Sequence, residues 1–213
     1  MATIPNGILG GIQGQVGTVT GYNRYGIDVI RVAKNSGVVK PTAKRIAQRS
    51  KITVCNVFAK AFAGKGFFTK TFPAFGHTGS GYNRAVSALM SLALVPSADG
   101  VTISYPLVLI SKGNLPPALN AAAAATAAGN IQFTWKDNTG TGTSKKNDKA
   151  VLVAYFPATN EVVYSFGAGT RASGNAVLET VNREGQAAET WIGYLSDDEK
   201  DAACSVYTGH VIL

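Results

Sequence analysis

The sequence has few charged residues, cysteines and histidines, and each shortage excludes a class of protein. Charged residues make up 15% of the 213 residues, below the quarter that is usual in a soluble domain. The two cysteines and two histidines (Cys55, His77, Cys204 and His210) have no metal-ligand spacing, and two cysteines make no disulfide framework. No apolar run approaches the roughly 20 residues of a membrane-spanning helix. We therefore expect a protein without a metal, a cofactor or a membrane span.

Acidic residues are almost absent from the first half of the chain. Residues 1–115 contain thirteen Lys or Arg residues and only two acids, Asp28 and Asp99, which gives a net charge of +11. Residues 116–213 have a net charge of −3, and residues 34–70 contain nine cations and no acid. A basic half joined to a mildly acidic half favours a polyanionic partner or head-to-tail association between copies of the chain.

A secretory signal is also missing from the N-terminus, M-A-T-I-P-N-G-I-L-G-G, which has neither a basic region nor a long apolar region. We therefore expect synthesis in the cytoplasm, with incorporation into a virion or similar particle as one destination.

The N-terminal 33 residues predict a β-hairpin preceded by a glycine-rich segment. Residues 6–21 place six glycines among apolar residues, which is typical either of a flexible arm or of strands with close backbone approaches. Asn23–Gly26 reads as a turn, and Ile27–Val32 as the returning strand. The hairpin should span about residues 15–33.

A helix from Thr42 to about Phe62 carries the candidate binding residues. Apolar spacing predicts a buried stripe formed by Ile46, Ser50, Val54, Val57, Phe58, Ala61 and Phe62. The candidate polyanion- or partner-binding residues are Lys40, Lys44, Arg45, Arg49 and Lys51. Cations in a first helical turn oppose the helix dipole, so their presence favours an anion bound there. A solvated basic face is the alternative.

The rest of the chain predicts an α+β protein with two domains. A second helix should cover residues 81–94, followed by strands at residues 101–104 and 107–110. Lys112–Pro117 is the best boundary, which gives a basic assembly domain over residues 1–115 and a second domain over residues 116–213. Ala118–Ala128 is compatible with either helix or strand. Six or seven short strands follow, which predict an antiparallel β-sandwich of the immunoglobulin or fibronectin kind.

One acidic cluster, formed by Asp197, Asp198, Glu199 and Asp201, lies between the last two predicted strands. A solvated hairpin tip is one interpretation. The other is a counter-surface for the basic helix of a neighbouring copy. Calcium binding is a third interpretation, although the pattern and the glycine of an EF-hand loop are missing.

Four segments of the sequence resemble an uncharacterised family that is common in Bacteroidota. They are N-G-I-L-G-G-I-Q-G-Q-V-G-T-V-T-G with the following I-D-V-I-R, K-P-T-A-K-R-I-A-Q-R-S-K, L-V-L-I-S-K-G-N-L-P and F-T-W-K-D-N-T-G-T-G. The family has no assigned activity, so the resemblance implies no catalytic residue. Similar N-termini occur near phage-derived genes, so the resemblance favours a role in a virion or particle. This chain lacks the acidic residue that such proteins often carry after the Thr, so its helix start is more basic.

Four functions follow from these features. The first is a non-enzymatic structural protein, a self-assembling homo-oligomeric subunit of a virion or phage-like particle. The second is a nucleic-acid-binding module that uses the same cations. An enzyme is disfavoured because no acid, base, nucleophile or metal set is framed by a motif. A surface adhesin would fit the sandwich but not the missing secretory signal.

Overall fold

The computed structural model describes residues 3–4, 10–33, 40–62, 66–76, 78–97 and 100–213. The chain forms two compact units, Met1–Ala43 and Lys44–Leu213.

The N-terminal unit is a small antiparallel sheet with strand order β1-β2-β3. Its strands are β1 (Gly14–Val16), β2 (Val19–Arg24) and β3 (Ile27–Val32). Gly21 of β2 must be glycine, because a Cβ atom there would lie 2.2 Å from the carbonyl oxygen of Ile12. Among the described residues of this unit only Gly21 is buried. Several apolar side chains of the sheet are therefore exposed: Val16, Ile27, Ile30 and Val32.

The second unit begins with a helical layer. It contains α1 (Ala43–Ala61), α2 (Phe67–Thr71) and α3 (Gly81–Ala88), which continues as the π-helical η3 (Leu89–Ala93). The Ser80 hydroxyl accepts a hydrogen bond from the Asn83 N–H and so caps α3. The predicted second helix is therefore present, with its last turn wider than an α-helical turn.

A short hairpin follows the helices, formed by β4 (Leu94–Ser97) and β5 (Gly100–Ile103). The strand predicted for residues 107–110 is wrong. Pro106 lies in the 3₁₀-helix η4 (Tyr105–Leu107), and the chain then runs on without strand pairing. Val108 and Ile110 are nevertheless buried, so their apolar character reflects packing in the core and not a sheet.

Two antiparallel sheets pack as a sandwich in the C-terminal half, as the sequence predicts. One sheet has the order β10-β7-β6 and the other β12-β11-β8-β9. The strands are β6 (Leu119–Ala125), β7 (Ile131–Lys136), β8 (Lys149–Phe156), β9 (Glu161–Thr170), β10 (Asn175–Leu178), β11 (Ala187–Leu195) and β12 (Val206–Ile212). The alanine run therefore forms a strand, β6. The protein consists mostly of antiparallel sheets with a few helices.

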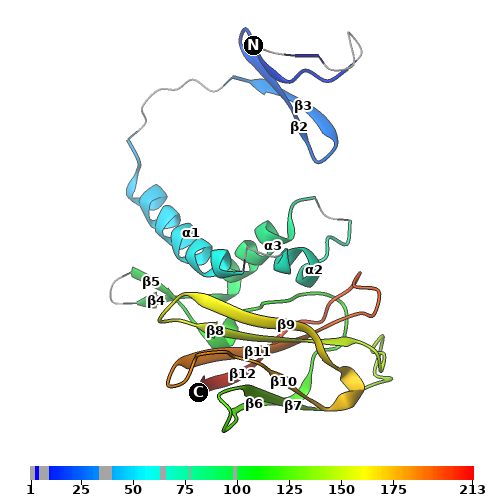
Figure 1. Ribbon diagram of the computed structural model, residues 1–213. Coiled ribbons are helices and arrows are strands. Elements are labelled where there is room, and N and C mark those ends of the chain that lie inside the picture. Colours follow the sequence, from blue (N-terminus) through cyan, green and yellow to red (C-terminus); the bar gives the residue numbers. More distant parts are fainter. Residues whose placement is uncertain (1–2, 5–9, 34–39, 63–65, 77, 98–99) are drawn as a thin grey trace. The chain divides into compact units, whose positions relative to one another are not determined.

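The central strands β8 and β11 are buried on both faces. Leu152 and Ile192 pack between the two sheets, whereas Val153 and Trp191 pack against the helical layer. Figure 1 shows the helices on one side of the four-stranded sheet. The helices and that sheet thus share a core, which runs across the predicted division at residues 115 and 116. The division into domains over residues 1–115 and 116–213 stays a prediction.

The buried face of α1 differs from the predicted stripe. Ile46 and Val57 are 53% and 51% exposed, and Ser50 is exposed as well. The residues that enter the core are Cys55, Phe58, Ala59 and Phe62. Only the last two turns of the helix reach the core, so the predicted stripe is right for Phe58 and Phe62 and wrong for Ile46, Ser50 and Val57.

Candidate functional site

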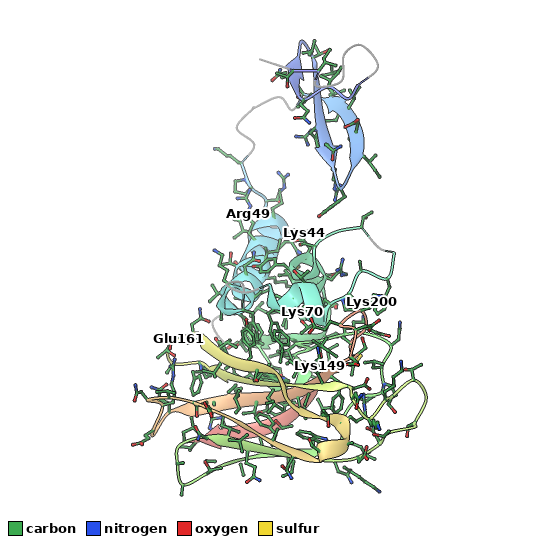
Figure 2. The ribbon with its side chains drawn as sticks, turned by 45° about the vertical axis from the view of Figure 1, so that its right-hand side comes forward. Lys44, Arg49, Lys70, Lys149, Glu161 and Lys200 are labelled. Carbon is green, nitrogen blue, oxygen red and sulfur yellow. The ribbon has the colours of Figure 1, made fainter. Side chains whose placement is uncertain are left out.

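The first half of α1 is exposed on all sides. Every residue from Lys44 to Thr53 is exposed, a length of about three helical turns. The predicted cations Lys44, Arg45, Arg49 and Lys51 all lie in this segment, two of them labelled in Figure 2. Lys40 is exposed too, but it precedes the helix and belongs to the N-terminal unit. The structure therefore brings four of the five predicted residues together on one helix.

Three of these cations have no acidic partner within the described part of the chain. The side chains of Lys44, Arg49 and Lys51 make no ion pair with a described residue, and the first turn of α1 contains no acid. The N–H groups at the start of a helix carry partial positive charge, which adds to that of Lys44. This segment therefore attracts anions.

Two exposed apolar residues and a threonine lie on one face of α1 beside the cations. Ile46, Thr53 and Val57 are separated by seven and four residues, so their side chains lie on one face of the helix. A hollow of about 270 Å³ opens next to Thr53 and Val57. Its other lining residues are Val54, Phe58, Thr102, Ile103, Tyr105 and Tyr155.

The floor of this hollow is aromatic. The ring of Phe58 lies 4.8 Å from that of Tyr155 and 6.5 Å from that of Tyr105, measured between centroids. Burial, with Tyr105 as a neighbour, raises the pKa of Tyr155 to about 12. Its hydroxyl is therefore neutral near pH 7, and it donates a hydrogen bond to Asn160 Oδ1 at 3.0 Å. The hollow can thus hold an apolar group next to neutral hydroxyls.

A buried carboxylate, Glu189, interacts electrostatically with Tyr105 of this hollow. Glu189 on β11 is buried, accepts a hydrogen bond from the Tyr207 hydroxyl, and has Oε1 3.0 Å from His210 Nδ1. Burial, and secondarily the charge of Glu189, raises the pKa of Tyr105. Sequence reasoning missed the hollow and Glu189 because their residues come from α1, β5, η4, β8 and β11, and no short motif contains them.

The predicted acidic counter-surface is partly engaged within its own chain. Glu199 Oε2 lies 2.6 Å from Lys70 Nζ, and Glu199 Oε1 lies 2.9 Å from Lys149 Nζ. Hydrogen bonds from these two lysines lower the pKa of Glu199. Figure 2 labels both lysines.

The other acids of the loop differ in how exposed they are for contact with a neighbouring subunit. Asp201 Oδ1 accepts hydrogen bonds from the backbone N–H groups of Ala202 and Asn114 at 2.7 and 3.0 Å. Asp198 bonds Ser196 and the backbone of Lys200 within the loop, and remains exposed together with Asp197. A contact between this loop and the basic helix of a neighbour stays a prediction.

The residues considered as metal ligands are dispersed. Cys55 is buried in α1, Cys204 lies near the backbone of Gly113, and His77 falls outside the described residues. Within the described ranges, no three His, Cys, Asp or Glu residues are placed to hold a metal ion. None of the helices described is both long and apolar enough to span a membrane.

Residues 11–209 match a family described as "Family of unknown function (DUF6266)". The chain belongs to this family. Both the cations of α1 and the acidic loop lie within the matched region of the family. No curated protein matches the chain.

A solved structure, that of the chicken CNTN1 FN1–FN3 domains, is similar over 55% of the present chain, with a TM-score of 0.38 and 8% sequence identity. The chain spans 41% of that protein.

Proposed function

We propose that this protein is a non-enzymatic structural subunit, which assembles with neighbouring subunits through α1. The observation that carries the proposal is the exposure of every residue from Lys44 to Thr53, which together carry four cations and no acid. A helix that buries no side chain over three turns gains little from packing, and isolated helices shorter than about 12–15 residues are marginal in water. A partner that covers this segment with negative charge would stabilise it.

The N-terminal unit supports the same proposal. Its three short strands expose Val16, Ile27, Ile30 and Val32, and bury only Gly21 among the described residues. A small sheet needs a covered apolar face to be stable by itself. Contact with another molecule would supply such cover, as expected for a protein that functions within an assembly.

The assembly that we propose is a virion or phage-like particle built from copies of this chain. The positive N-terminal half and the mildly negative C-terminal half suit head-to-tail packing of identical subunits. In this arrangement the sandwich, of the immunoglobulin or fibronectin kind, is the outward-facing part. Light scattering and electron microscopy of the purified full chain at high concentration should show particles or oligomers. Monomers alone would contradict the proposal.

The same cations support a second function, the binding of nucleic acid. Phosphate neutralisation by Lys44, Arg49 and Lys51 would make the affinity fall steeply with salt, with a logarithmic slope of about −0.9 for each duplex phosphate contacted. A gel-retardation assay at low salt tests this alternative. Absence of any shift at 50 mM salt would remove it.

A further inference from the structure

We propose that a groove beside α3 binds a small aryl carboxylate, an organic anion with a flat apolar ring. The groove has a volume of about 510 Å³ and is lined by three segments: residues 72–75 after α2, one face of α3 and η3, and the loop over residues 112–114. We call it the α3 groove. Pockets of about 300–1,000 Å³ with aromatic walls and a few polar groups are typical sites for small-molecule ligands.

The helix contributes small and polar side chains to the α3 groove. Arg84, Ser87, Ala88 and Ser91 line it, and their spacing places them on one face of the helix. The Ser91 hydroxyl donates a hydrogen bond to the Ser87 carbonyl oxygen at 3.0 Å, whereas the Ser87 hydroxyl makes no hydrogen bond with a described residue. The Ser87 hydroxyl can therefore donate to a ligand.

Arg84 fixes the wall of the groove that is formed by residues 72–75. Its Nε and Nη2 donate to the Phe72 carbonyl oxygen at 3.1 and 2.6 Å, and its Nη1 donates to the Gly79 carbonyl oxygen at 2.7 Å. These acceptors are neutral, and Arg84 makes no ion pair with a described residue. The wall thus carries a positive charge that is held in place without a counter-charge.

The loop over residues 112–114 forms a second fixed wall. The backbone N–H of Lys112 donates to the Thr71 carbonyl oxygen at 2.9 Å. Gly113 packs so closely that a Cβ atom there would lie 2.1 Å from the carbonyl oxygen of Ala202. The side chain of Lys112 is exposed and makes no ion pair with a described residue. The backbone of this wall is therefore fixed, while its ammonium group can reach an anion.

The charge of the α3 groove favours an anion. Arg84 and Lys112 are the charged residues among the described residues that line it, and no acid is among them. Asp201 lies beside the loop, but its Oδ1 accepts hydrogen bonds from the N–H groups of Asn114 and Ala202 at 3.0 and 2.7 Å. Hydrogen bonds from a cation to a carboxylate are about twice as strong as those between neutral groups.

An exposed aromatic ring favours a flat apolar body on the same ligand. Phe75 is 48% exposed, and its φ of 43° lies in the left-handed region, which is unusual for a bulky residue. Phe72 and Ala88 provide buried apolar surface in the same groove. A nucleic-acid strand would need cations spaced along its backbone, whereas two cations and a short aromatic wall match one carboxylate joined to one ring system.

Equilibrium dialysis of the full chain against 2-naphthoate, followed by the fluorescence of the naphthalene ring, tests the proposal. The neutral analogue 2-naphthalenemethanol is the second probe. Acetate and a single-stranded DNA of about twelve nucleotides serve as competitors. We expect one naphthoate per chain, bound at least about tenfold more tightly than the neutral analogue. Neither competitor should displace it at a concentration equal to that of naphthoate.

Three groove variants should each weaken naphthoate binding by about tenfold. Lys112→Gln removes the free cation, and Ser87→Leu fills the groove with a residue that suits a helix. Phe75→Gly removes the ring at a backbone conformation that glycine adopts readily, so folding is retained. Lys146→Gln and Ser50→Leu are matched controls on exposed residues outside the groove and should bind like the unmodified chain. Circular dichroism checks that all five variants are folded.

The proposal is overturned if the neutral analogue binds as tightly as naphthoate, or if the DNA displaces naphthoate at equal concentration. It is also overturned if any of the three groove variants binds like the unmodified chain, or if naphthoate does not bind. None of the described residues that line the α3 groove belongs to α1, so the proposal goes beyond the assembly function. Dialysis reports binding by monomers and assemblies alike, which keeps the two tests independent.

Discussion

The buried ion pair between Arg171 and Asp148 gives a quantitative prediction about stability. The guanidinium Nε lies 2.9 Å from Asp148 Oδ2, and the two side chains are 0% and 1% exposed. The same guanidinium donates to Asn138 Oδ1 at 2.7 Å and to the carbonyl of Pro116 at 3.1 Å, and it lies 3.9 Å from the ring centroid of Tyr194. One side chain thus joins the loop before β8 to the segment before β6.

Asp148→Asn should lower the free energy of unfolding by about 3–5 kcal/mol, because it leaves the charge of Arg171 buried without its counter-charge. The matched control is Glu161→Gln, which breaks the ion pair with Arg183. Glu161 is 53% exposed, so this variant should cost at most about 1 kcal/mol. The double variant Arg171→Met with Asp148→Asn should cost less than the sum of the two single changes, because it removes both charges.

Urea unfolding at pH 7, followed by circular dichroism, measures these free energies. Equal slopes against urea would show that the variants unfold the same amount of structure. A loss of less than about 1 kcal/mol for Asp148→Asn would refute the reasoning, since it would mean that water reaches the pair.

Phe58→Ala should lower the free energy of unfolding by about 3–5 kcal/mol, because this ring joins α1 to the sheet. Two spectroscopic probes should still report a single unfolding transition, and two separate transitions would contradict a shared core. The pKa of Glu199 is lowered in the folded chain, so its pairing with Lys70 and Lys149 stabilises the fold at neutral pH. This contribution disappears as the pH falls below the ordinary glutamate pKa of about 4.3. Glu199→Gln should therefore flatten the acid limb of a plot of stability against pH, and an unchanged limb would contradict the pairing. Gly81→Ala should destabilise the chain in thermal unfolding, because the new Cβ would lie 1.9 Å from the carbonyl oxygen of Phe68, and an unchanged midpoint would count against this close contact.

The sandwich strands could be predicted because their sequence patterns are local. Residues 131–136 alternate between buried and exposed positions, and turns separate the strands. The apolar run of β8 over residues 150–156 also contains the information that both faces of this strand are covered. That covering layer was not predicted, because the helices come from a different part of the chain.

The candidate site could be predicted only in part. Charge along the sequence indicated Lys44, Arg45, Arg49 and Lys51, and the structure leaves these residues exposed. Periodicity placed Ile46 and Val57 in the core. Ile46 instead lies in the exposed first half of α1, and Val57 lies on another face of the helix than the core residues.

Two further features depend on contacts distant in sequence. Glu199 belongs to an acidic run, but its lysine partners lie 129 and 50 positions earlier in the chain. Arg171 lies in a loop sequence, T-R-A-S-G, with no local sign of burial. Such pairings arise only when the fold brings the segments together.

The central claim is that α1 is the assembly surface. Sedimentation velocity over a range of concentrations tests it most directly, with the full chain and the double variant Arg49→Glu with Val57→Asp. The account predicts species larger than the 22.1 kDa monomer for the unmodified chain and a shift to the monomer for the variant. A variant that assembles like the unmodified chain, or an unmodified chain that stays at 22.1 kDa at every concentration, would contradict the claim.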